Sequence, residues 1–170
     1  MKITFVEAVK SGFLKFRVFK GTSSRPEYWY FVLFTLLLTI VLGTVEAIIW
    51  PPVQTEDLME ALQQPTPLSN VAALVLLVPS LAVTSRRIRD AGWSGKWLLT
   101  LLLPVIPFVF GAVGAISYLE SVASPSVEEL VGLISYFVPA VLLAIAVQIF
   151  LLVLCIRPTK TQEQGNKYAS

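Results

Sequence analysis

Four long apolar stretches dominate the sequence and restrict how the chain can fold. They cover about residues 29–50, 68–85, 97–119 and 130–156. A helix that crosses the hydrocarbon core of a bilayer needs roughly 20 mainly apolar residues, and each stretch is near this length. Because backbone polar groups cannot stay unpaired in lipid, such stretches form helices. We therefore expect an all-α integral membrane protein, a four-helix bundle of spans.

The composition supports this class and excludes several kinds of site. Hydrophobic residues make up 55% of the chain and charged residues 14%, whereas a soluble domain carries roughly a quarter charged residues. A chain of 170 residues suits a single membrane domain, 1–170. Histidine is absent and Cys155 is the only cysteine. Catalysis by imidazole, Cys/His zinc sites and an internal disulfide are therefore excluded.

The charges are segregated between the two sides of the predicted spans. The positive residues fall in three segments: Lys2, Lys10, Lys15, Arg17, Lys20 and Arg25 before the first span, Arg86, Arg87, Arg89 and Lys96 between the second and third, and Arg157, Lys160 and Lys167 after the fourth. The opposite loops carry only carboxylates: Glu56, Asp57, Glu60, Glu120, Glu128 and Glu129. Cytoplasmic loops of membrane proteins are enriched in Lys and Arg. We therefore expect both termini, including the tail 157–170, to be cytoplasmic.

The third apolar stretch contains Pro104 and Pro107 and has two possible topologies. It could be a kinked span or a re-entrant hairpin. A hairpin would move the positive tail to the outer side, against the charge bias. A kinked span is favoured, since neighbouring groups can satisfy the carbonyls that a proline leaves free. Pro79 and Pro139 are expected to act similarly in the second and fourth spans.

The segment before the first span, residues 1–20, is predicted to form an amphipathic helix on the cytoplasmic face. Aromatic and apolar residues recur at helical spacing and the basic residues lie off that stripe: Phe5, Val9, Phe13 and Phe16 against Lys10, Lys15 and Arg17. The stripe could rest in the membrane interface, or it could pack on the inner ends of the spans. Ser24 is a plausible N-cap for the first span, with Pro26 in its first turn.

Three segments resemble a known family. They are Phe19–Trp29 (FKGTSSRPEYW), Arg86–Trp97 (RRIRDAGWSGKW), and Arg157-Pro158 followed by Gly165–Tyr168 (GNKY). Their order and spacing are similar to those of the YhaH-like family of small bacterial inner-membrane proteins, the domain of unknown function 805. The resemblance implies a multi-pass protein of the bacterial inner membrane and brings no known reaction, substrate or cofactor.

This chain departs from the family pattern at four positions. Thr22 stands where the family usually has Arg, Lys96 where it has an aromatic residue, and Ala169 where it has Gly. Arg89 stands where the family usually has His. If that histidine has a proton-linked role in the family, this chain cannot share it.

The densest group of charged residues is the predicted inner loop from Arg86 to Lys96, which faces the start of the first span. The candidate site residues are Arg25, Glu27, Arg86, Arg87, Arg89 and Asp90. The favoured interpretation is a topology anchor in which the carboxylates neutralise some arginines. An anionic headgroup or ligand site is the alternative, because arginine matches phosphate geometry. A docking patch for another protein is the third possibility.

Polar residues inside the spans are few. Glu46 lies about one turn from Trp50, so we expect it to snorkel to the outer interface. Gln148 lies deeper in the fourth span and is expected to hydrogen-bond to a neighbouring helix. Gly111 and Ala115 place small residues one turn apart, which suits close helix packing.

These features favour a non-enzymatic accessory, scaffold or lipid-interacting membrane protein. The alternative is a small oligomeric transporter or channel, because proline breaks can line a pathway. An enzyme is disfavoured, since the chain shows neither a serine-based nor a metal-based catalytic pattern. We expect no catalytic residues, metal or cofactor. The expected partners are membrane lipids, with anionic headgroups at the cytoplasmic face, and a membrane protein or second copy, but no nucleic acid.

Overall fold

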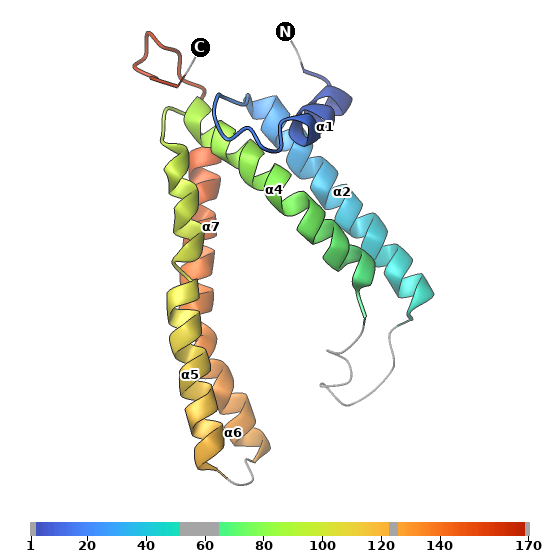
Figure 1. The fold of residues 1–170 in the computed structure, drawn as a ribbon, viewed down its shortest axis with the longest axis vertical. Coiled ribbons are helices and arrows are strands. Elements are labelled where there is room, and N and C mark those ends of the chain that lie inside the picture. Colours follow the sequence, from blue (N-terminus) through green and yellow to red (C-terminus); the bar gives the residue numbers. More distant parts are fainter. Residues whose placement is uncertain (1–2, 52–64, 123–125, 169–170) are drawn as a thin grey trace. The chain divides into compact units, whose positions relative to one another are not determined.

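The computed structural model describes residues 3–51, 65–122 and 126–168, and every regular element in these ranges is helical. This confirms the all-α fold class. The chain divides into two compact units (Figure 1). Unit 1 combines residues 1–95 with residues 158–170, and unit 2 is residues 96–157. The expected single domain thus contains two helical units. Four charged residues used in the sequence argument, Lys2, Glu56, Asp57 and Glu60, lie outside the described residues.

Four helical stretches are long and apolar enough to cross a membrane, as the sequence predicts. The first two are single helices: α2 (Arg25–Ile49) and α4 (Pro67–Asp90). The third joins a 3₁₀ segment, η1 (Gly95–Leu102), to α5 (Val105–Ser121). The fourth follows the short helix α6 (Val127–Gly132) and joins the 3₁₀ segment η2 (Leu133–Phe137) to α7 (Val138–Ile156). The protein is therefore a multi-pass membrane protein.

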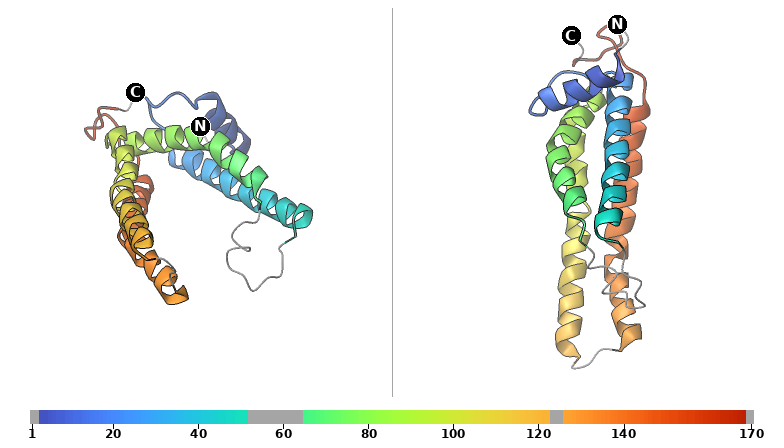
Figure 2. Two further views of the ribbon diagram at one scale, coloured as in Figure 1. Left: turned by 60° about the horizontal axis from the view of Figure 1, so that its bottom comes forward. Right: turned by 90° about the vertical axis from the view of Figure 1, so that its right-hand side faces the viewer.

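In unit 1, α2 and α4 lie side by side and antiparallel (Figures 1 and 2). Glu46, near the end of α2, contacts Ser69 in the first turn of α4. Glu27, at the start of α2, pairs with Arg86 near the end of α4. These two contacts bring the start of α2 and the end of α4 to the same end of the unit. The helix α1 (Phe5–Leu14) lies against both of them there.

The helix α1 is shorter than the expected 1–20 because both of its ends are capped. Thr4 and Glu7 form a reciprocal capping box at the start, and the backbone turns away after Lys15. Ala8 and Gly12 are buried, and a Cβ at Gly12 would overlap the Phe31 ring of α2. Part of the apolar stripe therefore packs on the first span, as one of the two interpretations predicted.

The helix α4 extends farther than the sequence suggested. We expected the second span to end at residue 85 and the charged residues to occupy a loop, but the helix continues to Asp90. Arg87 and Asp90 pair one turn apart within the helix, so their charges are compensated without leaving it. The loop is reduced to residues 91–94, where Gly92 adopts a positive φ of 86°.

In unit 2, α5 and α7 form a second antiparallel pair. The Trp97 ring at the start of the third span makes an edge-to-face contact with the Phe150 ring near the end of the fourth. Farther along, the backbone of Tyr136 lies against Gly111, where a Cβ would overlap its carbonyl oxygen. Gly111 and Ala115 are both buried, so the small residues do permit close packing. The third stretch is a single interrupted span, as expected, and not a hairpin.

Pro139 differs from its expected role in the fourth span. It stands in the first turn of α7. The N–H that proline lacks would have no partner within the helix at this position, so nothing is lost. Pro139 therefore begins α7 after the 3₁₀ segment instead of kinking a continuous helix. Pro79, by contrast, lies inside α4.

Candidate functional site

The six candidate residues lie at one end of unit 1, at the start of α2 and the end of α4. Ser24 caps α2 by accepting a hydrogen bond from the Glu27 backbone N–H at 3.4 Å, and Pro26 occupies the first turn, as the sequence predicts. This cap fixes the Glu27 side chain at the helix start. The last turns of α4 present Arg86, Arg87 and Asp90 from a buried position.

Glu27 and Arg86 form the first ion pair, which joins three helices. Their nearest charged atoms are 3.6 Å apart, and both side chains are buried. The Ser11 hydroxyl of α1 donates to the same carboxylate oxygen at 2.7 Å. A charge in such a site is tolerated only when it is paired and hydrogen-bonded. The pair therefore holds α1, α2 and α4 together at this end.

Arg87 and Asp90 form the second ion pair. Arg87 is 0% exposed, so its guanidinium is wholly removed from solvent. The Asp90 carboxylate accepts from Arg87 and also from the Thr159 hydroxyl at 2.6 Å. Thr159 belongs to the tail that follows the fourth span. This pair therefore connects the end of α4 to a segment 69 residues away in sequence.

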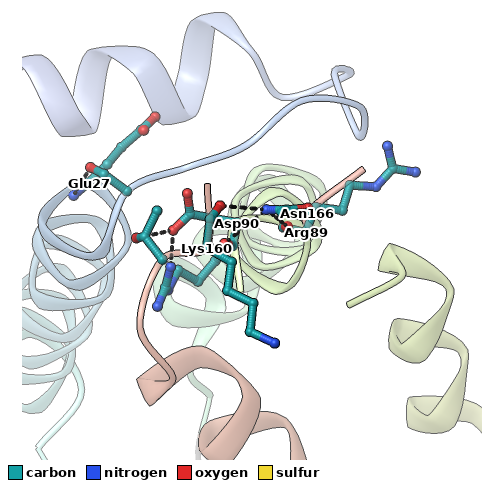
Figure 3. A network of polar contacts seen from close by, with 8 residues as sticks. Glu27, Arg89, Asp90, Lys160 and Asn166 are labelled. Atoms are coloured by element: carbon teal, nitrogen blue, oxygen red, sulfur yellow. Dashed lines mark hydrogen bonds and ion pairs between the residues drawn. The ribbon is translucent and has the colours of Figure 1, made fainter. Parts of the chain in front are cut away.

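Asn166 is the functional part of the tail that the sequence analysis did not single out. Its side-chain amide donates to the backbone carbonyls of Arg89 at 3.1 Å, Asp90 at 3.2 Å and Lys160 at 2.9 Å (Figure 3). Its carbonyl oxygen accepts from the Tyr168 backbone N–H at 3.0 Å. The last carbonyls of a helix have no partner within the helix. Asn166 thus closes α4, and the GNKY motif was the only sequence signal for it.

Arg89 stands apart from these contacts. Figure 3 shows its side chain extending away from Asp90, and its guanidinium lies 5.1 Å from the centroid of the Tyr168 ring. A hydrogen bond from the Ser94 side chain lowers the pKa of the Tyr168 hydroxyl below its ordinary value, and the nearby positive charges of Lys167 and Arg89 act in the same direction. Arg89 therefore contributes to docking the tail and not to the buried pairs.

Arg25 occupies the first position of α2 and is exposed. Its positive charge acts on Asp90 electrostatically. The structure thus brings together all six candidate residues at one end of unit 1, but in different roles. Glu27, Arg86, Arg87 and Asp90 form the buried pairs, while Arg25 and Arg89 lie at the edge.

Three buried polar atoms have no hydrogen-bond partner among the described residues: Arg86 Nη2, Arg89 Nε and Ser23 Oγ. Ser23 lies beside Arg86, because its backbone N–H donates to the Arg86 carbonyl at 3.2 Å. An unpaired guanidinium nitrogen is costly to bury, so it would gain from an anionic oxygen. In the described part of the chain, no group of three or more His, Cys, Asp or Glu side chains could hold a metal ion.

An open pocket of about 460 Å³ adjoins Asp90. It is lined by Thr22, Asp90 and the tail residues 159–163, so hydroxyl groups and charges of both signs surround it. The docked tail supplies most of this lining. The sequence did not predict the pocket, because it depends on where the tail folds back.

Glu46, at the other end of unit 1, does not have the role expected for it. Its side chain is buried instead of reaching solvent. It accepts hydrogen bonds from the Ser69 backbone N–H at 3.0 Å and from the Ser69 hydroxyl. The residue before α4, Thr66, gives that helix no side-chain cap. Glu46 therefore caps α4 from the neighbouring helix, and the snorkelling interpretation was wrong.

Comparison with known proteins agrees with the resemblance noted from the motifs. The chain is 30% identical to the inner membrane protein YhaH of Escherichia coli over 89 residues, which are 52% of this chain and 66% of YhaH. It is also 30% identical to the inner membrane protein YhaI of the same organism over 88 residues, 52% of this chain and 64% of YhaI. The match thus spans slightly less than two thirds of each relative.

No solved structure matches this chain. The family described as "Protein of unknown function (DUF805)" matches residues 16–170, which include both spans of each unit and the tail. The four stretches able to cross a membrane fit relatives that are named inner membrane proteins. The chain therefore belongs to the DUF805 family of membrane proteins of unknown function.

Proposed function

We propose that the protein is a non-enzymatic accessory or scaffold protein of the bacterial inner membrane that interacts with lipid. In this proposal the arginine cluster is an architectural latch, defined as the pairs Glu27–Arg86 and Arg87–Asp90. The observation that carries the proposal is that both pairs are buried and hold separate elements together. Through these pairs and their hydrogen-bond partners, the latch holds α1, the end of α4 and the tail together.

The state of the two latch carboxylates favours architecture over catalysis. Glu27 is engaged by Ser11 and Arg86. Asp90 is engaged by Arg87 and Thr159. A catalytic acid or base must reach its substrate and exchange a proton with it. The two carboxylates are buried and bound within the protein, so they are poorly placed for this.

The charge distribution supports a cytoplasmic position for the latch. In unit 1, α1 lies at the start of α2, and the tail binds the end of α4, so these basic segments lie at one end. Positively charged segments that flank spans remain in the cytoplasm. We therefore propose that this end, with both termini of the chain, faces the cytoplasm.

A double-mutant cycle on Glu27 and Arg86 tests the latch. Glu27→Gln and Arg86→Met should each lower the free energy of unfolding by about 3–5 kcal/mol, because each leaves a buried group without its partner. The double variant should recover most of that loss, since no charge remains buried. Stability would be measured on purified protein in detergent, with the exposed Glu163→Gln as the matched control.

The same variants separate the latch from a ligand site. If the single variants keep their stability but lose an anionic lipid that co-purifies with the wild type, the cluster is a headgroup site and the latch is refuted. The scaffold role is tested by crosslinking the protein in its own membrane, followed by native mass spectrometry. Recovery of the chain with neither a protein partner nor bound lipid would contradict that role.

A further inference from the structure

The helix α1 packs against the beginning of the first span, α2. Its aromatic contacts on α2 are Tyr30, Phe31 and Phe34. These residues lie about 8–14 Å along α2 from its first residue, at 1.5 Å per residue. Trp29 is on the same part of α2 and remains partly exposed. Tryptophan side chains prefer the headgroup level, which favours a position of α1 near the headgroups.

The face of α1 that points away from α2 is both apolar and basic. Ala8 and Gly12 are buried on the packed side. Val6, Lys10 and Leu14 recur every fourth residue on the opposite side, and Val6 and Leu14 are 72% and 71% exposed. Together these three residues form an outer stripe on α1.

The segment after α1 is also both apolar and basic. Phe16, Val18 and Phe19 are exposed, and they alternate with basic residues. Together with Lys10, the exposed cations of this surface are Lys15, Arg17 and Lys20. The nearby Glu7 carboxylate accepts a hydrogen bond from the Thr4 backbone N–H at 2.8 Å and keeps its negative charge. Four cations against this one carboxylate leave the surface with a positive excess.

We propose that this outer surface, Val6 to Lys20, binds anionic phospholipid of the inner leaflet. The apolar side chains would enter the headgroup and acyl boundary, and the four cations would face the phosphate groups, which is how interfacial amphipathic helices bind. A second copy of the chain fits poorly, because four positive charges would face four others. The assignment to the inner leaflet rests on the cytoplasmic orientation proposed above.

The test places an environment-sensitive fluorophore on α1. Leu14→Cys would be labelled in a Cys155→Ser background, and Glu163→Cys on the exposed tail would be the matched control. The protein would be reconstituted in nanodiscs of phosphatidylcholine with or without phosphatidylglycerol, with spin-labelled lipid as the quencher. We expect the label on α1 to be shifted to the blue and quenched, and more strongly in anionic discs. The label at position 163 on the tail should keep the emission of a fluorophore exposed to water.

A charge variant identifies the lipid class. Changing Lys10, Lys15, Arg17 and Lys20 to Gln should bring quenching in anionic discs down to the level in phosphatidylcholine. The double variant with Lys160→Gln and Lys167→Gln on the tail should keep the stronger quenching in anionic discs. Raising the salt concentration should reduce the anionic preference of the wild type, because exposed charges are screened.

Each other outcome has a definite meaning. A water-like label at position 14 in both kinds of disc would overturn the proposal and leave the surface to a protein partner. Equal quenching in both would overturn the anionic assignment. Nanodiscs expose both membrane faces, so these results do not depend on orientation. Reaction of the Leu14→Cys variant with an impermeant thiol reagent outside intact spheroplasts would instead overturn the cytoplasmic orientation.

Discussion

Asn166 has several hydrogen-bonding roles on one short side chain. Its two amide hydrogens are shared among three backbone carbonyls, two of them in the last turn of α4. Gly165, with a positive φ of 83°, allows the preceding turn that directs Asn166 toward the helix. A side chain with both donors and an acceptor is needed here, because the Tyr168 N–H must also be satisfied.

Replacing Asn166 should therefore loosen the tail. Asn166→Ala removes one donor from each of three carbonyls, of which Arg89 and Asp90 keep the backbone N–H groups of Gly92 and Lys160. The change should therefore cost about 0.5–1.5 kcal/mol in unfolding free energy. Asn166→Asp should be worse, because a carboxylate would face carbonyl oxygens. Limited proteolysis within residues 158–168, combined with thermal unfolding, would measure the effect. Glu163→Gln on the same tail is the control, and equal resistance of Asn166→Ala and this control would contradict the assigned role.

At this scale the sequence revealed part of the site. Arg87 and Asp90 are three residues apart on a helix, so their pairing is a local property. Glu27 could be placed near Arg86 from the order of the spans. Asn166 could not be paired with Asp90, which is 76 residues away. No periodic pattern links a tail of mixed polar residues to one particular helix end.

The helices depend on one another for their caps. The first N–H groups of α4 have no side-chain cap from Thr66, and Glu46 of α2 supplies the acceptor through Ser69. Hydropathy alone suggested that the Glu46 carboxylate reaches water. It could not show that the neighbouring helix begins at the same level, which is a tertiary fact.

Glu46→Ala should therefore destabilise the pair of α2 and α4 at the end away from the latch. Both hydrogen bonds to Ser69 would be lost, whereas Glu46→Gln keeps one acceptor and should lose less. Ser69→Ala should resemble Glu46→Gln, because the Ser69 backbone N–H can still bind the carboxylate. Crosslinking between cysteines placed near the two helix ends would measure the separation, with Thr44→Val as a control. A stable Glu46→Ala variant would restore the snorkelling interpretation.

The lengths of the elements show where sequence reasoning has its limit. The charges from Arg86 onward suggested a loop, but buried pairing keeps that segment helical to Asp90. In the opposite direction, residues 15–20 suggested more helix than α1 has. Local composition reports whether a segment prefers water. It does not report whether the fold supplies partners that make burial or helix favourable.

For the whole molecule, the hydropathy and charge patterns were sufficient for the four spans and their class. They were not sufficient for the division into two units, because unit 1 is built from two stretches far apart in sequence. That division depends on the tail returning to α4. The spans can be predicted because lipid acts on each of them separately, whereas the tail is fixed by a few specific hydrogen bonds.

Removing residues 158–170 should affect the two units unequally. The truncated chain keeps all four spans but loses the contacts of Thr159 and Asn166 with Asp90. Amide exchange should become faster near the end of α4, while α5 and α7, whose ring and glycine contacts lie within unit 2, should change little. Hydrogen exchange read by mass spectrometry would show this. Uniform loss of protection across both units would refute it.

The discontinuity of unit 1 bears on how the protein is made. The tail leaves the ribosome only after the whole of unit 2, residues 96–157, has been synthesised. It can reach Asp90 only if the intervening chain has crossed the bilayer an even number of times. A molecule in which one of these spans failed to insert would carry its tail on the wrong side and leave the end of α4 uncapped. Docking of Asn166 therefore follows the synthesis of unit 2, and it requires the tail and the end of α4 to lie on the same side of the bilayer.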